Sequence, residues 1–133
     1  MARKIQNKKG NIFCIVGDGE ANEGSIWESL LIAVSNKLNN LIVIIDYNKS
    51  QIRSLEPNLN TKMFKSFGCD VALVDGHDVE QLIDSMSVFD KPKVVLANTV
   101  KGKGVKEIED NMFAWHHRAP TDEEYEKFIE VIG

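Results

Sequence analysis

The sequence predicts an α/β protein built on a doubly wound, mostly parallel sheet with helices on both faces. Short, continuously apolar runs alternate along the chain with segments whose apolar residues recur at helical spacing. Continuous rather than alternating hydrophobicity is typical of parallel strands that are covered on both faces. A chain of 133 residues is long enough to bury a core, and we expect a single domain over 1–133.

Four apolar runs predict the strands. The first, at 11–16, ends at a Gly-Asp-Gly turn, and the second, at 41–46, is apolar up to its final acid. Two more strands are expected at 70–74 and 93–98. Because strands that alternate with helices form parallel sheets with right-handed crossovers, we expect the first two strands to be neighbours.

The segments between these runs predict the helices. A helix of three to four turns is expected from Ser25, with shorter helices near 61–67 and 79–88. A polar, glycine-bearing loop follows the last strand. The final helix is expected to open at Thr121, where Thr-Asp-Glu-Glu after Pro120 forms a capping box.

Composition excludes several classes of partner. The net charge of −4 would repel a polyphosphate backbone, so we expect no nucleic acid. Residues 1–10 are basic but lack the apolar run of a secretion signal, and the longest apolar stretch, at 41–45, is far too short to span a bilayer. We therefore expect a cytoplasmic protein without a membrane partner. Cys14 and Cys69 lie in apolar stretches and are interpreted as buried core residues.

The residues that end the first two strands carry the chemistry. Ligands bind beyond the carboxyl ends of the strands in a doubly wound sheet. The glycines of Gly17-Asp18-Gly19 let the backbone approach a phosphate closely, and the helix that follows offers unpaired N–H groups. If the two strands are neighbours, Asp18 and Asn48 project oxygens into one cleft. A carboxylate, an amide oxygen and a nearby anion suit Mg²⁺, which prefers oxygen ligands and shared phosphates.

A longer motif surrounds these residues. The stretch GDGEANEGSIWESLLIAVSNKLNNLIVIIDYNKSQI resembles the thiamine diphosphate motif, which begins Gly-Asp-Gly and closes on an asparagine, here Asn48. Within that superfamily the chain is similar to transketolases, especially those split into N- and C-terminal subunits. Three further passages support this likeness, namely VDGHD at 74–78, TVKGKGV at 99–105 and WHHRAP at 115–120. The resemblance implies the thiamine diphosphate-binding fold.

The same resemblance implies the ligands of the metal and of the cofactor. Asp18 and the Asn48 side chain would coordinate Mg²⁺, with the backbone carbonyl of Ser50 as a third protein ligand. The implied contacts of the diphosphate are Gly17, Gly19 and the backbone amide of Glu20.

Three more residues receive roles from the resemblance. Ile52 would pack against the thiazolium region, and Glu23 would be an acid near a subunit interface that couples paired active sites. Alternatively, Glu23 is a first-turn acid favoured by the helix dipole, and Ile52 is a loop residue that covers core. His116 would reach the substrate oxygen near the reacting carbon, although a histidine in a polar loop is usually solvated. His117 stands where related split transketolases tend to have glycine, which reduces the freedom of the loop.

The activity implied by the resemblance is transfer of a two-carbon ketol unit between sugar phosphates, with thiamine diphosphate and Mg²⁺ as cofactors. A partner chain would supply the pyrimidine-binding domain and its activating glutamate, and an oligomer is expected. Relative to the family the chain looks incomplete at its N-terminus.

One alternative to this activity is a non-catalytic remnant or binding module of the same fold. The other is the α component of a 2-oxo acid dehydrogenase, against which DGHD and WHHRAP argue.

Overall fold

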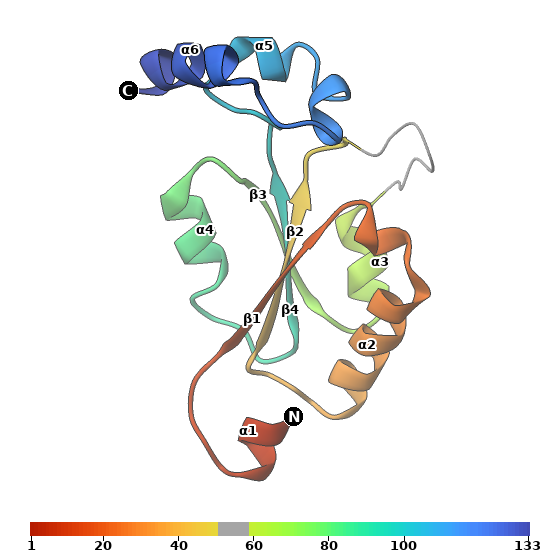
Figure 1. Ribbon diagram of the computed structural model, residues 1–133. Coiled ribbons are helices and arrows are strands. Elements are labelled where there is room, and N and C mark those ends of the chain that lie inside the picture. The colour runs from red at the N-terminus through yellow and green to blue at the C-terminus, as the bar shows by residue number, and fades with distance from the viewer. Residues whose placement is uncertain (51–58) are drawn as a thin grey trace. The chain divides into compact units, whose positions relative to one another are not determined.

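The computed structural model describes residues 1–50 and 59–133. Within it the chain forms two compact units, 1–98 and 99–133. The first unit contains a four-stranded sheet, and the second contains short helices and the C-terminal helix (Figure 1). The expectation of a single domain over 1–133 stays a prediction.

The sheet is parallel throughout, as the alternation of elements predicts. Its strands are β1 (Ile12–Gly17), β2 (Leu41–Tyr47), β3 (Asp70–Asp75) and β4 (Lys93–Asn98), and their order is β1-β2-β4-β3. The predicted pairing of the first two strands is confirmed, with Gly17 opposite Asp46. Their carboxyl ends therefore meet at one edge of the sheet.

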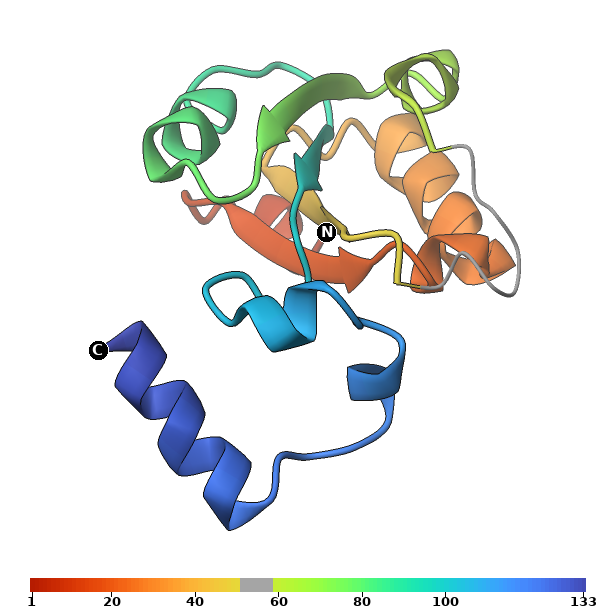
Figure 2. The same cartoon turned by 90° about the horizontal axis from the view of Figure 1, so that it is seen from above.

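Helices cover both faces of this sheet, which confirms the doubly wound architecture. The helical elements of the first unit are α1 (Ala2–Ile5), η1 (Glu20–Asn22), α2 (Gly24–Ser35), α3 (Thr61–Ser66) and α4 (Val79–Ser85). Seen from above, α2 and α3 lie on one side of the sheet and α4 lies on the other (Figure 2). Side chains cap the N-termini of α3 and α4, because Asn60 and Asp78 accept hydrogen bonds from backbone N–H groups there.

The core of this unit consists of one apolar cluster on each face of the sheet. On the side of α2 and α3, the buried members include Leu30, Val43, Ile45, Phe64, Val94 and Leu96. On the side of α4, the buried members are Ile42, Val74, Val95 and Ala97, with Leu82 and Met86 packed against them. The Trp27 ring of α2 stacks on Phe64 of α3 at 5.0 Å between centroids. This contact ties the helix after the Gly-Asp-Gly turn to the core.

One strand departs from the sequence prediction. Four consecutive residues of β1 are exposed, with Phe13 at 57% and Ile15 at 72% of full accessibility. Cys14 is exposed as well, so the prediction that it is a buried core residue is wrong, whereas Cys69 is buried as predicted. The reason is position, because β1 lies at the edge of the sheet and its only neighbour among the described strands is β2.

The second unit consists of short helices and the C-terminal helix of the chain. It comprises α5 (Lys106–Glu109), η2 (Ala114–His116) and α6 (Asp122–Ile132). The capping box predicted at Thr121 is confirmed, since the Thr121 side chain accepts from the Glu124 backbone N–H and Glu124 accepts from the Thr121 N–H. Across the parts of the chain that the structure describes, no helix is both long enough and apolar enough to cross a bilayer.

Candidate metal and diphosphate site

The ends of β1 and β2 bring together the residues that the sequence predicts as metal ligands. Asp18 follows the last residue of β1, and its backbone N–H donates to the Asp46 carbonyl at 3.1 Å. This bond extends the pairing of the two strands by one residue. Asp18 is only 3% exposed, so its carboxylate is buried at the end of β1.

The start of the loop after β2 contacts that carboxylate. The backbone N–H of Lys49 donates to Asp18 Oδ2 at 2.6 Å. Lys49 has a φ of 60°, a left-handed conformation that is uncommon for a residue with a side chain and turns the chain sharply here. The three predicted metal ligands Asp18, Asn48 and Ser50 therefore come together in one place.

The electrostatics of Asp18 favour a cation. Burial raises the pKa of its carboxyl group above the usual 3.8, the N–H groups of Lys49 and Gly19 lower it, and the negative charge of Asp46 raises it again. A positive charge bound at Asp18 would offset the unfavourable effect of the Asp46 charge. The oxygen ligands present, a carboxylate, an amide and a backbone carbonyl, are those that Mg²⁺ prefers.

The Gly-Asp-Gly turn closes on itself in this structure. The Gly17 N–H donates to the carboxylate of Glu20, and a Cβ at Gly17 would lie 3.4 Å from Glu20 Oε2. Gly19 has a φ of −62°, a conformation open to any residue, so its backbone angle does not require glycine. The turn rests on the core through buried Ala21, whose carbonyl accepts from Trp27 Nε1 at 2.8 Å.

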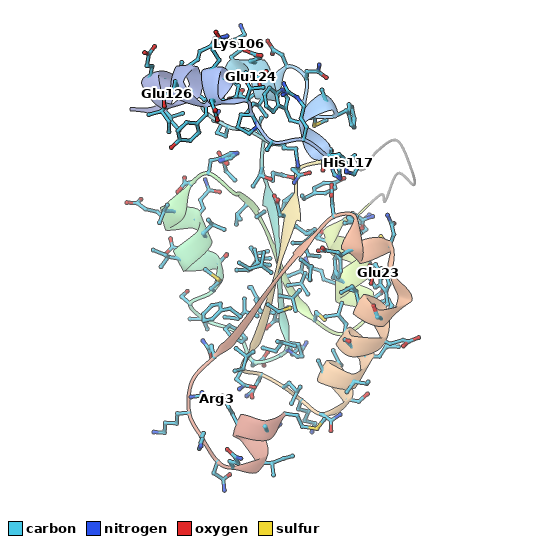
Figure 3. All side chains as sticks on the ribbon, in the orientation of Figure 1. Arg3, Glu23, Lys106, His117, Glu124 and Glu126 are labelled. Carbon is cyan, nitrogen blue, oxygen red and sulfur yellow. The ribbon has the colours of Figure 1, made fainter. Side chains whose placement is uncertain are left out.

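Two other predicted residues lie around this turn. Glu23 stands directly before α2 at its N-cap position and is exposed (Figure 3). Its carboxylate accepts from Ser25 Oγ at 3.3 Å and makes no side-chain cap to the helix backbone. Ile52 lies outside the described residues. The interface role of Glu23 and the thiazolium contact of Ile52 stay predictions.

His116 belongs to the second unit, where it ends η2. It is exposed, and its ring meets that of His117 edge-on at 4.5 Å. The residues on either side of the pair are anchored. Arg118 stacks on the Trp115 ring at 3.6 Å and makes a two-pronged ion pair with Glu124 at 2.8 and 2.9 Å. The two histidines thus lie between Trp115 and Arg118, whose side chains are both packed or paired.

Comparison with known protein families shows which family this chain belongs to. Residues 3–131 match a sequence model described as the transketolase, thiamine diphosphate binding domain. The chain belongs to this family. The match includes both strand ends and the histidine loop, and it confirms the resemblance read from the motifs.

Several relatives are subunits of split transketolases. The chain is 37% identical to one subunit of the apulose-4-phosphate transketolase of Actinobacillus succinogenes, over 99% of this chain and 50% of that protein. It is 32% identical to one subunit of a 6-deoxy-6-sulfo-D-fructose transketolase from a Clostridium species, over 92% of this chain and 48% of that protein. The chain thus spans about half the length of these relatives.

A solved structure supports the same assignment. The transketolase of Campylobacter jejuni superposes with a TM-score of 0.72 at 33% identity, over 80% of this chain and 19% of that one. This likeness agrees with the parallel sheet and its helices, and the fold expected for the transketolase family is confirmed.

Two features of the site were missed at the level of sequence. Asp46 was noted only as the acid that ends an apolar run, yet it contacts both Asp18 and Asn48. The backbone N–H of Lys49, which holds the Asp18 carboxylate, leaves no sequence signal because any residue carries it. Among the described residues no three His, Cys, Asp or Glu side chains gather around a metal position, so an all-side-chain metal centre is not found there.

Proposed function

We propose that this chain is the thiamine diphosphate- and Mg²⁺-binding component of a transketolase-like enzyme that moves a two-carbon ketol unit between sugar phosphates. The observation that carries the proposal is the convergence of Asp18 with Asn48 and Ser50 beyond two neighbouring strands. The names of the split relatives, which are transketolase subunits for sugar derivatives, support this class of reaction.

Each residue has a definite task in this proposal. Asp18, the Asn48 side-chain oxygen and the Ser50 carbonyl would hold Mg²⁺, an ion that prefers oxygen ligands and shared phosphates. The diphosphate contacts are the backbones of Gly17, Gly19 and Glu20, close to the N-terminus of α2 and its positive dipole end. Thiamine diphosphate, when bound, supplies a nucleophilic thiazolium carbon. The protein residues anchor and orient the tail of the cofactor.

The proposal divides the rest of the active site between a partner chain and three further residues of this chain. A partner chain provides the pyrimidine-binding domain and its activating glutamate, and the assembly is an oligomer. By the same proposal, Ile52 would contact the thiazolium and Glu23 would act near the interface between active sites. His116 donates a hydrogen bond to the substrate oxygen, or exchanges a proton with it, as charge develops on that oxygen.

A non-catalytic binding module of the same fold is the second candidate. Both candidates bind the cofactor and metal at the same residues. They differ in turnover of a ketose donor once a partner chain with the pyrimidine-binding domain is added.

Titration calorimetry tests the shared part of the proposal. Thiamine diphosphate is titrated into the chain in two separate experiments, one with Mg²⁺ and one with a chelator in its place. We expect weak binding that requires the divalent ion, because the residues assigned here hold the ion and the tail, while the pyrimidine clamp is proposed to lie on a partner chain. Tight binding in the presence of the chelator would contradict the roles of Asp18 and Asn48.

Three variants separate the ligands. Asp18→Ala and Asn48→Ala each remove a ligand oxygen. We expect Asp18→Ala to abolish Mg²⁺-dependent binding and Asn48→Ala to weaken it to a level that is still measurable, while circular dichroism shows an intact fold in both. Ser50→Ala is the matched control, because Ser50 is proposed to act through its backbone carbonyl and the substitution keeps that group. A loss of binding in Ser50→Ala comparable to that in Asp18→Ala would overturn the ligand assignment.

A further inference from the structure

The side-chain amide of Asn48 is held at both ends. Its Nδ2 donates to Asp46 Oδ2 at 2.8 Å, and its Oδ1 accepts from the Ser50 N–H at 2.9 Å. Asp46 and Asn48 are half-buried and Ser50 is buried, so water competes little for these bonds. The orientation of the amide is therefore set by the protein.

The chemistry of the two partners allows one orientation only. An ionised carboxylate accepts hydrogen bonds and cannot donate, whereas a backbone N–H donates and cannot accept. Rotating the Asn48 amide by half a turn would place oxygen against the Asp46 carboxylate and NH₂ against the Ser50 N–H. Both contacts would then be repulsive. The oxygen of the amide keeps a second lone pair beyond the one used by Ser50.

Asp46 is itself fixed by the sheet. It lies in β2, opposite Gly17 of β1 and Ala97 of β4, so its backbone is paired on both sides. Its carbonyl accepts from the Asp18 N–H while its carboxylate accepts from Asn48. One residue of a central strand thus contacts both proposed metal ligands.

We propose that Asp46 is a positioning residue of the metal site, which turns the Asn48 amide so that its oxygen, and not its NH₂, faces the cation. The inference rests on the proposed function for the identity of the ion. Groups that orient metal ligands in this way typically change metal affinity about 10- to 100-fold when removed.

Two substitutions distinguish orientation from charge. Asp46→Leu removes both the acceptor and the charge, whereas Asp46→Asn removes the charge but keeps an oxygen for Asn48 Nδ2. We expect Mn²⁺ affinity in the presence of thiamine diphosphate, measured by electron paramagnetic resonance, to fall about 10- to 100-fold in Asp46→Leu. The fall in Asp46→Asn should be several times smaller. Equal losses would show that Asp46 acts through charge alone and would overturn the inference.

A second background tests whether Asp46 works through Asn48. In Asn48→Ala, adding Asp46→Leu should cause no further loss of metal affinity, because no amide remains to be oriented. Asp75→Asn is the control for charge, since Asp75 is also an acid at the carboxyl end of a strand of this sheet and its Oδ1 accepts from the His77 N–H. An additive loss in the double variant would contradict the proposal.

A measurement without metal keeps the inference separate from the proposed function. The ¹⁵N–¹H signals of the Asn48 side-chain NH₂ should exchange slowly with solvent in the native chain and in Asp46→Asn, and rapidly in Asp46→Leu or Asp46→Ala. If no variant changes these signals, the orienting contact is absent. If the signals respond as expected but neither Asp18→Ala nor Asn48→Ala affects metal binding, the metal proposal fails and the contact is structural only.

Discussion

The charged form of Asp18 is proposed to bind the metal, but its burial lowers the stability of the fold. Its carboxylate is buried beside Asp46, and burial raises the pKa of the group above 3.8. The folded chain therefore holds the Asp18 proton more tightly than the unfolded chain does. Ionisation of Asp18 then lowers the free energy of unfolding as the pH rises from about 3.8 through the folded pKa, and this cost persists at neutral pH.

Asp18→Asn should consequently stabilise the metal-free chain at neutral pH. The substitution removes the buried charge and keeps an oxygen for the Lys49 N–H, and we expect a gain of roughly 1 kcal/mol, the usual scale of a single substitution. Urea unfolding at pH 7 and at pH 3 measures it, and the gain should shrink at the lower pH. The same variant should lose Mg²⁺-dependent cofactor binding. Destabilisation at pH 7 would mark Asp18 as a structural turn acid.

His116 and His117 are predicted to differ in function although they are neighbours in an exposed loop. His116→Ala should lower turnover by about 10²- to 10⁴-fold, the typical contribution of a proton-transfer group, and barely change cofactor affinity. His117→Ala should have a smaller effect. Transient kinetics with a ketose donor measure both terms, in an assembly that contains the partner chain. Nearly full turnover in His116→Ala, or loss of cofactor binding, would place His116 among solvated loop residues.

At the scale of elements, the loop 99–105 depends on two glycines for different reasons. Gly102 and Gly104 have φ of 77° and 99°, which disfavour any side chain. A Cβ at Gly102 would also lie 2.1 Å from Ile108 Cγ2 in α5, whereas a Cβ at Gly104 would lie 3.4 Å from Ile132 Cγ2. Of these two positions, only the first lacks space as well as conformational freedom.

Alanine at these two positions separates the effects. Gly104→Ala should lower the free energy of unfolding by about 1–2 kcal/mol through its left-handed backbone alone. Gly102→Ala should lose about 1–3 kcal/mol more through overpacking against Ile108. Trp115 fluorescence in a Trp27→Phe background reports the second unit during urea unfolding. Equal losses at the two glycines would show that the loop moves freely away from α5.

At the scale of the whole molecule, the apolar edge of the sheet governs solution behaviour. Exposed apolar residues on an edge strand invite pairing with another chain, and Phe13 and Ile15 are exposed on β1. We expect the isolated chain to self-associate as its concentration rises. Ile15→Lys should reduce this association, measured by light scattering, without loss of helical signal.

Val88→Lys is the matched control for this prediction. Val88 is an exposed apolar residue outside the sheet, so the same change of charge should leave association unchanged. A wild-type chain that stays monomeric at all concentrations would contradict the prediction, and equal effects of both lysines would assign association to net charge.

Much of the architecture was predictable from local pattern. Continuous apolar runs predicted the four parallel strands, and the capping signal at Thr121 predicted the start of α6, because burial on both faces and helix capping are local demands on composition. The pairing of β1 with β2 followed from the right-handed crossover, and it placed Asp18 beside the loop that carries Asn48.

The tertiary structure alone decided which strand lies at the edge of the sheet and where the side chains of the site point. The apolar pattern of β1 did not show that this strand is an edge, since strand order depends on contacts far apart in the sequence, and Cys14 is exposed for that reason. Nor did the acid at Asp46 show that its carboxylate faces the Asn48 amide, because a side chain's direction depends on the register of the strands around it. Sequence alone thus determined the family and the candidate ligands, and only the packed sheet decided how those ligands are oriented.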